Sequence, residues 1–151
     1  MIREYHPDDL QACVDLLIEV YAGEPWHCYW TIETATRYLN EFLSNDNFVG
    51  FVIDENASIA GAMFAHRKTW WTEDELFVDE LYVASQLQRH GHGGRLLVHA
   101  ESYAKARGLA GLTLLTNRYM PATAFYTRHG YLQAEHVIFM YKELKSGSES
   151  R

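Results

Sequence analysis

The residues best suited to chemistry form a glycine-rich stretch in the second half of the 151-residue chain, from Gln88 to Gly93, here called the glycine turn. An apolar run typical of a strand precedes it, and an amphipathic run typical of a helix follows. Because glycine has no Cβ, a phosphate can approach the main chain closely, and the positive end of the helix dipole faces it. Arg89 and Arg95 add positive charge on both sides. The pattern therefore predicts a pyrophosphate-binding turn.

Two known phosphate-binding patterns compete for this turn. The dinucleotide fingerprint needs G-x-G-x-x-G after an early strand, and an acidic residue about 20 residues further on. Here position 89 is arginine, and no acidic residue occurs between Glu101 and Glu135. By contrast, Gln88, Gly91 and Gly93 resemble the acetyl-coenzyme A loop, Q/R-x-x-G-x-G/A, of the Gcn5-related N-acetyltransferase (GNAT) family.

A second segment, from Ala122 to Tyr131, reads A-x-x-F-Y-x-x-x-G-Y and is similar to a later helix of that family. The tyrosine of this helix commonly approaches the coenzyme sulfur, so the resemblance implies that Tyr126 is a general acid for the departing thiolate. A core aromatic is the alternative role. The family often has asparagine seven residues earlier, where this chain has Tyr119, and Asn117 is expected to take over that coenzyme contact.

Composition favours one folded domain outside the membrane. A hydrophobic content of 48% and an aromatic content of 14% exclude general disorder. No apolar run approaches the roughly 20 residues that span a bilayer, no secretory stretch opens the chain, and two cysteines suit a reducing compartment. We therefore expect a cytoplasmic domain over residues 1–145, no membrane association, and a flexible tail at 146–151.

Charge is divided unevenly along the chain. Residues 1–85 hold 16 acidic and 4 basic residues, a net of −12, whereas residues 86–151 hold 4 acidic and 9 basic residues, a net of +5, which gives the overall −7. This division suggests two ligands of opposite charge, coenzyme A and a cationic amine. Surface acids that only aid solubility are the alternative. An acidic chain argues against nucleic acid as a partner.

Hydrophobic periodicity and turn residues predict alternating strands and helices. The expected elements are a strand at 2–5, a helix opened by Pro7 to Asp9, a second helix capped by Thr31, strands at 48–53 and 58–65 around a turn at 54–56, a strand at 76–84, a helix that ends at Gly108, a strand at 112–116, a helix from Pro121 to near Gly130, and two closing strands within 131–144. This order matches the resembling family. It implies an α/β (α+β) fold with one GNAT-like domain, in which helices flank a central mixed, mostly antiparallel sheet with splayed central strands.

The resemblance also implies which residues hold acetyl-coenzyme A. Main-chain groups exposed by the splayed strand would bind the pantetheine arm, although the apolar side chains there have an obvious role as core. The expected coenzyme contacts are Leu81, Tyr82, Val83, Gln88, Arg89, His90, Gly91, His92, Gly93, Gly94, Arg95, Asn117 and Tyr126. His90 and His92 have no third ligand nearby, so no metal is expected.

Glu80 is the expected general base, since some family members that acetylate aminoglycosides carry an acidic residue at this offset before the coenzyme loop. Burial beside aromatic groups would raise its pKa towards the useful range. Asp79 is the second candidate, and strand alternation places it on the opposite face. An ion-paired structural carboxylate is the alternative role for both.

Aromatic residues cluster in two segments that border the acceptor site in the resembling fold. Together with nearby acids they suit an ammonium ligand through cation–π contact, and lid packing or a dimer interface is the alternative. The expected substrate-binding residues are Trp26, Tyr29, Trp30, Trp71 and Glu80. Dimers are frequent in the resembling family, so a homodimer is also expected.

The resemblance implies an N-acetyltransferase that uses acetyl-coenzyme A as co-substrate. The acceptor is expected to be a primary amine of a small cationic molecule, aminoglycoside-like or polyamine-like, which attacks directly in a ternary complex. A peptide or protein N-acetyltransferase is the alternative enzyme. A non-catalytic sensor of acyl-coenzyme A is the alternative of another class.

Overall fold

The computed structural model describes residues 1–145, and the predicted flexible tail at 146–151 lies outside the described residues. The chain divides into two compact units, Met1–Asn117 and the part that begins at Arg118. Within residues 1–145, no helix has the length and apolar character that crossing a bilayer requires.

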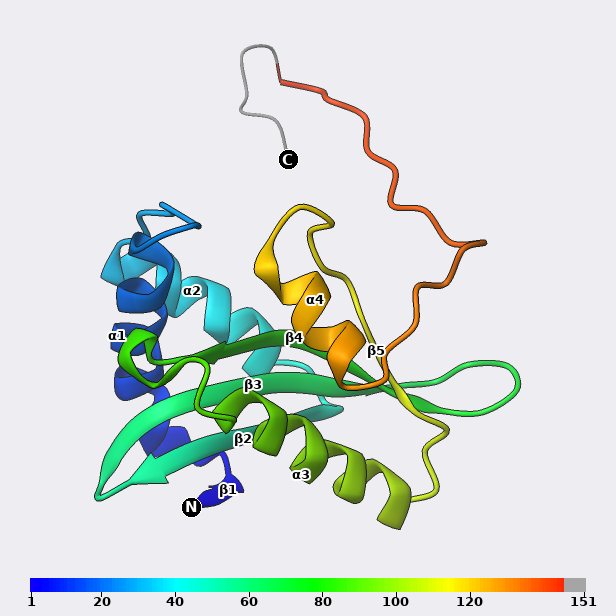
Figure 1. Ribbon diagram of the computed structural model, residues 1–151, viewed down its shortest axis with the longest axis horizontal. Coiled ribbons are helices and arrows are strands. Elements are labelled where there is room, and N and C mark those ends of the chain that lie inside the picture. The colour runs from blue at the N-terminus through cyan, green and yellow to red at the C-terminus, as the bar shows by residue number, and fades with distance from the viewer. Residues whose placement is uncertain (146–151) are drawn as a thin grey trace. The chain divides into compact units, whose positions relative to one another are not determined.

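The first unit is built on a five-stranded sheet with the strands in chain order (Figure 1). The strands are β1 (Ile2–Glu4), β2 (Phe48–Glu55), β3 (Ser58–Lys68), β4 (Glu75–Val83) and β5 (Leu112–Leu114). Neighbouring strands run antiparallel, except that β4 and β5 run parallel. The predicted mixed, mostly antiparallel sheet is therefore confirmed.

Helices cover both faces of this sheet. The first unit holds α1 (Leu10–Ala22), α2 (Ile32–Leu43) and α3 (His92–Ala106), and the second unit holds α4 (Pro121–Arg128). Short 3-10 turns at Pro7–Asp9 and Ser85–Leu87 lead into α1 and into the glycine turn. Thr31 caps α2, as predicted, because its hydroxyl accepts from the Thr34 N–H at 3.0 Å. Gly108 follows the end of α3 with a φ of 71°, the left-handed conformation expected at this position.

The two faces of the sheet have separate cores. On one face, α1 and α2 pack against Phe64 and Tyr82 with buried side chains such as Leu17 and Leu39. On the other face, the Phe51 ring lies against aromatic side chains of α3, which crosses in front of the sheet in Figure 1. The face that a β4 side chain occupies therefore decides whether it meets α1 and α2 or α3.

Two predictions about strands need correction. The turn between β2 and β3 is shorter than predicted: Asn56 and Ala57 form it, with φ values of 55° and 63°, so Asp54 and Glu55 belong to the strand. Positive φ at both central residues is the signature of the two-residue turn that matches strand twist. The two closing strands predicted within 131–144 are wrong, because residues 131–144 form no strand. An alternating pattern makes a strand only where a second strand supplies its hydrogen bonds.

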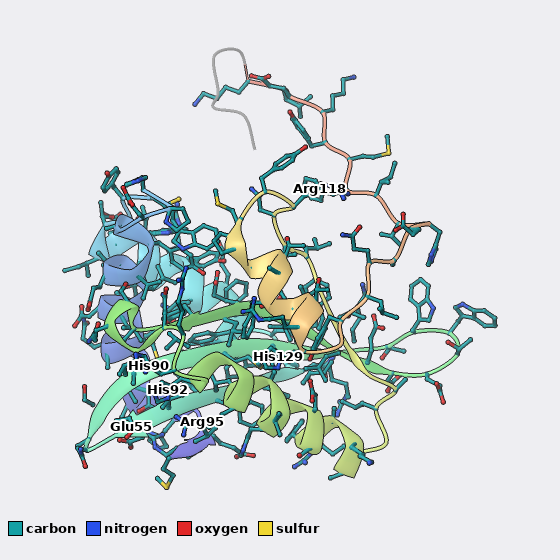
Figure 2. The ribbon with its side chains drawn as sticks, viewed as in Figure 1. Glu55, His90, His92, Arg95, Arg118 and His129 are labelled. Carbon is teal, nitrogen blue, oxygen red and sulfur yellow. The ribbon has the colours of Figure 1, made fainter. Side chains whose placement is uncertain are left out.

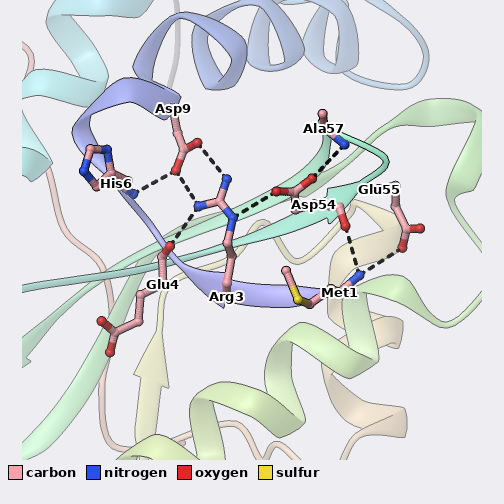
Figure 3. Close-up of polar contacts among 8 residues, drawn as sticks. All are labelled: Met1, Arg3, Glu4, His6, Asp9, Asp54, Glu55 and Ala57. Atoms are coloured by element: carbon pink, nitrogen blue, oxygen red, sulfur yellow. Dashed lines mark hydrogen bonds and ion pairs between the residues drawn. The ribbon is translucent and has the colours of Figure 1, made fainter.

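A polar network ties β1 to the turn before α1 (Figure 3). The Arg3 guanidinium donates to both oxygens of Asp9, each at 2.9 Å, and its Nε donates to Asp54 at 3.0 Å. Asp9 is only 8% exposed. The hydrogen bonds from Arg3 hold the pKa of this carboxyl below its usual value, against the effect of burial. The buried charge therefore depends on Arg3.

Candidate active site

Strand β4 contains a bulge at Asp79. Phe64 of β3 faces Glu80, but the next residue, Ala65, faces Val78, so Asp79 has no partner on β3. Residues paired across two strands share a face of the sheet, and the bulge therefore places Val78 and Glu80 on opposite faces. In a regular strand they would lie on the same face.

The bulge turns Glu80 towards the first two helices. The hydroxyl of Tyr21, from α1, donates to its Oε1, and the hydroxyl of Tyr38, from α2, donates to its Oε2 at 2.6 Å. Burial raises the pKa of Glu80, whereas the two tyrosine hydrogen bonds and the Leu81 N–H act in the opposite direction. A carboxylate with a raised pKa can accept a proton near neutral pH, so this arrangement suits a general base.

Two tryptophans pack against these tyrosines. The Trp26 ring meets Tyr21 edge-on, with ring centroids 5.5 Å apart, and the Trp30 ring stacks on Tyr38 at 4.7 Å. Both tryptophans are half-buried. Two of the predicted substrate-binding residues are thus brought next to the tyrosines that hold a third, Glu80.

The other two predicted substrate-binding residues are not brought into this cluster. Tyr29 is 77% exposed and Trp71 is 86% exposed. Trp71 lies in the loop between β3 and β4, at the far end of the sheet from the connection between α1 and α2 (Figure 1). Strand geometry places Glu80 roughly 16 Å along β4 from the end of that loop. A role for Tyr29 and Trp71 in substrate binding stays a prediction.

Asp79 lies on the same side of the sheet as Glu80, so the predicted placement on opposite faces is wrong. Its Oδ2 is 2.7 Å from Nδ1 of His66, and His66 shares the face of Phe64 because the two are two residues apart on a regular strand. Burial raises the pKa of Asp79, and the hydrogen bond with His66 opposes that rise. Alternation fails here because the bulge adds a residue to β4.

The part of β4 after the bulge has one free edge. Within residues 1–145, β5 pairs with β4 only at Leu76, Phe77 and Val78, whereas β4 continues to Val83 with β3 as its only partner strand. This is the predicted splay of the central strands. The Tyr82 side chain is buried, and its hydroxyl donates to the Cys13 carbonyl at 2.8 Å. Coenzyme binding by residues 81–83 would therefore use main-chain groups.

The glycine turn joins this strand to α3. Gln88 Nε2 donates to the Val83 carbonyl at 3.0 Å, which holds the start of the turn against the end of β4. Arg89 and Gly91 both have positive φ, at 67° and 81°. A Cβ placed on Gly91 would meet nothing within 4 Å, so the turn leaves open space there.

Helix α3 begins at His92, and in the described part of the chain no side chain caps its N-terminus. Gly93 and Gly94 occupy its first turn. Figure 2 shows His90, His92 and Arg95 gathered at this helix start, where Arg95 contacts Nδ1 of His92. Main-chain N–H groups without an internal partner, at the positive end of a helix, suit a phosphate. These residues therefore fit the pyrophosphate of a coenzyme.

The remaining predicted residues lie near or beyond the boundary between the units. Asn117 is the last residue of the first unit. Tyr126 lies in α4 of the second unit, where its ring packs against Phe125 and Tyr131, with centroids 5.1 and 5.6 Å away. Figure 2 labels Arg118 and His129 in the same unit. A coenzyme contact by Asn117 and an acid role for Tyr126 stay predictions.

Sequence reasoning missed three residues of this site. Tyr21, Tyr38 and His66 are not among the residues that the sequence predicts for the site. Tyr38 lies three residues after Ala35 and four before Phe42, on the apolar face of α2, so a search for hydroxyls on that face could have found it. His66 had no such signal. Within residues 1–145, no group of three or more His, Cys, Asp or Glu side chains could hold a metal ion.

Comparison with known proteins identifies the family. The model of the acetyltransferase (GNAT) family matches residues 10–131. The chain belongs to this family. GNAT enzymes use acetyl-coenzyme A, and the protein is an acyltransferase. A search of curated proteins found no match.

Many solved structures share the fold. A possible acetyltransferase from Clostridium difficile 630 is 16% identical, with a TM-score of 0.79 over 96% of this chain and 98% of that one. A transcriptional regulator from Bacillus halodurans is 21% identical, with a TM-score of 0.75 over 94% and 99%. The aminoglycoside antibiotic 6′-N-acetyltransferase AAC(6′)-Ig from Acinetobacter haemolyticus is 14% identical, with a TM-score of 0.75 over 96% and 99%. At these identities the similarity establishes the GNAT fold.

Proposed function

We propose that this GNAT enzyme transfers an acetyl group from acetyl-coenzyme A to a primary amine of a small cationic acceptor, aminoglycoside-like or polyamine-like. The observation that carries the proposal is the Glu80 carboxylate, which two tyrosines hold between α1, α2 and β4. An ammonium group must lose a proton before its nitrogen can attack a thioester. A carboxylate with a raised pKa beside aromatic rings meets that need.

In this proposal, residues 1–145 act as one domain that assembles a ternary complex. Acetyl-coenzyme A supplies the thioester carbonyl. The ammonium nitrogen loses one proton before it attacks, forms the new bond to the carbonyl carbon, and loses a second proton as the amide forms. The carbon–sulfur bond breaks and the sulfur takes up one proton, so one proton is released to solvent overall. Glu80 accepts the proton from the amine, and Tyr126 donates a proton to the departing sulfur.

The coenzyme is held by main-chain groups in this proposal. The free edge of β4 at residues 81–83 binds the pantetheine arm, and Asn117 adds a polar contact. The pyrophosphate lies on the glycine turn and the uncapped start of α3, with Arg89 and Arg95 beside it. Open space at Gly91 supports this fit, because the phosphate must approach the backbone closely.

Three observations support a cationic acceptor. Trp26 and Trp30 each pack against one of the tyrosines that hold Glu80, and aromatic faces attract ammonium groups. Residues 1–85 carry a net charge of −12, from 16 acidic and 4 basic residues. One structural neighbour is an aminoglycoside 6′-N-acetyltransferase, and another, AAC(6′)-Iy, was solved with the bisubstrate analogue CoA-S-monomethyl-acetylneamine.

The test is thiol release from acetyl-coenzyme A across a panel of aminoglycosides, polyamines and peptide amines. We expect turnover with a polycationic small amine, and a fall in kcat of about 100-fold in Glu80→Gln. Glu19→Gln, which changes an exposed carboxylate on α1, is the matched control and should retain activity. Faster turnover of peptides than of every small amine would refute the acceptor class. Coenzyme binding without turnover of any amine would favour a sensor.

A further inference from the structure

Each oxygen of the Glu80 carboxylate has its own tyrosine donor, and the two donors come from different helices. Tyr21, near the end of α1, contacts Oε1, and Tyr38, in the middle of α2, contacts Oε2 at 2.6 Å. A distance of 2.6 Å is typical of a hydrogen bond from a hydroxyl to an ionised oxygen. A tryptophan ring in turn packs against each tyrosine.

We propose that Tyr21 and Tyr38 are positioning residues that fix the plane of the Glu80 carboxylate and keep it ionised for proton transfer. This inference rests on the proposed function of Glu80 as general base. A glutamate side chain has three rotatable bonds, and a single donor would leave its carboxylate free to turn about that contact. Two donors on opposite oxygens fix both the position and the plane, which proton transfer requires.

The same hydrogen bonds offset the cost of burial. Burial disfavours the charged carboxylate and raises its pKa, whereas donors to the charged form lower it. The pKa of Tyr38 is itself raised, first by burial and then by Glu80, so its hydroxyl keeps the proton that it donates. Without these two donors, the carboxylate would take up a proton at a higher pH and would be a poorer base near neutrality.

Other groups around Glu80 also influence its charge. The titratable and charged side chains that face it or its donors are Tyr21 from α1, Tyr38 and Glu41 from α2, His66 from β3, and Asp79 and Tyr82 from β4. Asp79 acts against ionisation of Glu80, and His66 is hydrogen-bonded to Asp79. Removal of one tyrosine hydroxyl leaves the other groups in place.

The experiment compares Tyr38→Phe and Tyr21→Phe with Tyr103→Phe, a tyrosine of α3 whose ring packs against Phe51 on the other face of the sheet. Loss of one donor should lower kcat at pH 7 by about tenfold, since a hydrogen bond to a charged group is worth about that factor. The acidic limb of the kcat profile should move to higher pH in both variants. The KM for acetyl-coenzyme A should not change in either variant, and the profile of Tyr103→Phe should match that of the wild type.

A second readout does not depend on turnover. The Glu80 carboxyl carbon can be titrated by 13C NMR in the protein without ligands, with Glu80→Gln to assign its resonance. A higher titration midpoint in either tyrosine variant supports the proposal, even if no amine in the panel is acetylated. Midpoints and acidic limbs equal to those of the wild type in a folded variant would overturn it. Because each tyrosine is tested alone, failure of one variant to fold leaves the other decisive.

Discussion

Replacement of Gly91 by alanine tests the conformation of the glycine turn. Gly91 has a φ of 81°, and a Cβ built on it meets nothing within 4 Å. The substitution therefore adds no steric clash with other residues, and its cost comes from the backbone alone. For an alanine in the left-handed region that cost is about 1–2 kcal/mol, so the free energy of unfolding should fall by this amount.

Gly108 is the matched control, because it has a φ of 71° at the other end of α3 and equally open space. Equilibrium unfolding in urea should show similar losses for Gly91→Ala and Gly108→Ala. Gly91→Asn should lose less than Gly91→Ala, because asparagine tolerates the left-handed region better than alanine. An alanine variant at least as stable as the asparagine variant would refute the argument from φ.

Calorimetric titration with acetyl-coenzyme A should separate the two glycines. Strain at Gly91 lies in the turn proposed to bind the pyrophosphate, so relaxation of the turn should weaken coenzyme binding by up to about tenfold, the equivalent of 1.4 kcal/mol. Gly108→Ala should bind the coenzyme as the wild type does. Equal losses of affinity in the two variants would show that the turn has no special part in coenzyme binding.

Three further predictions concern buried charges and aromatic residues. In urea titrations, Glu80→Gln should become more stable relative to the wild type as the pH rises from 4 to 8. Burial raises the pKa of Glu80 in the folded state, so above the unfolded value of about 4.3 the unfolded wild-type chain loses this proton more readily than the folded protein does, and the wild type loses stability. Trp30→Ala should raise the KM for a cationic amine about tenfold in steady-state assays, and Trp71→Ala in the same assay tests whether the loop between β3 and β4 shares that role. Arg3→Met should lower the free energy of unfolding by about 2 kcal/mol at pH 7, less than a fully buried pair would lose because the Arg3 side chain is 32% exposed. The pKa of Asp9 is lowered in the folded state, so this loss should be present above the unfolded value of about 3.9 and should disappear as the pH falls through the folded pKa.

The sequence predicted the helix cap, the helix end and the glycine turn correctly, because each depends on interactions between residues close together in the chain. Thr31 caps its helix, Gly108 ends another, and the glycine turn joins a strand to a helix as expected. Each of these features depends on residues within a few positions of one another. The strands predicted within 131–144 failed because pairing depends on residues far away in the chain.

The position of Glu80 shows why the site itself needed the structure. The sequence D-E within an apolar run indicates two carboxylates on opposite faces, and only pairing with β3 reveals the bulge that puts both on one side. The choice of base then depends on what each carboxylate contacts rather than on alternation. Asp79 has a histidine partner that opposes the effect of its burial. Glu80 has two neutral hydroxyl donors, so its charge is stabilised without a neighbouring cation. The histidine hydrogen bond lowers the affinity of Asp79 for a proton, which favours Glu80 over Asp79 as the base.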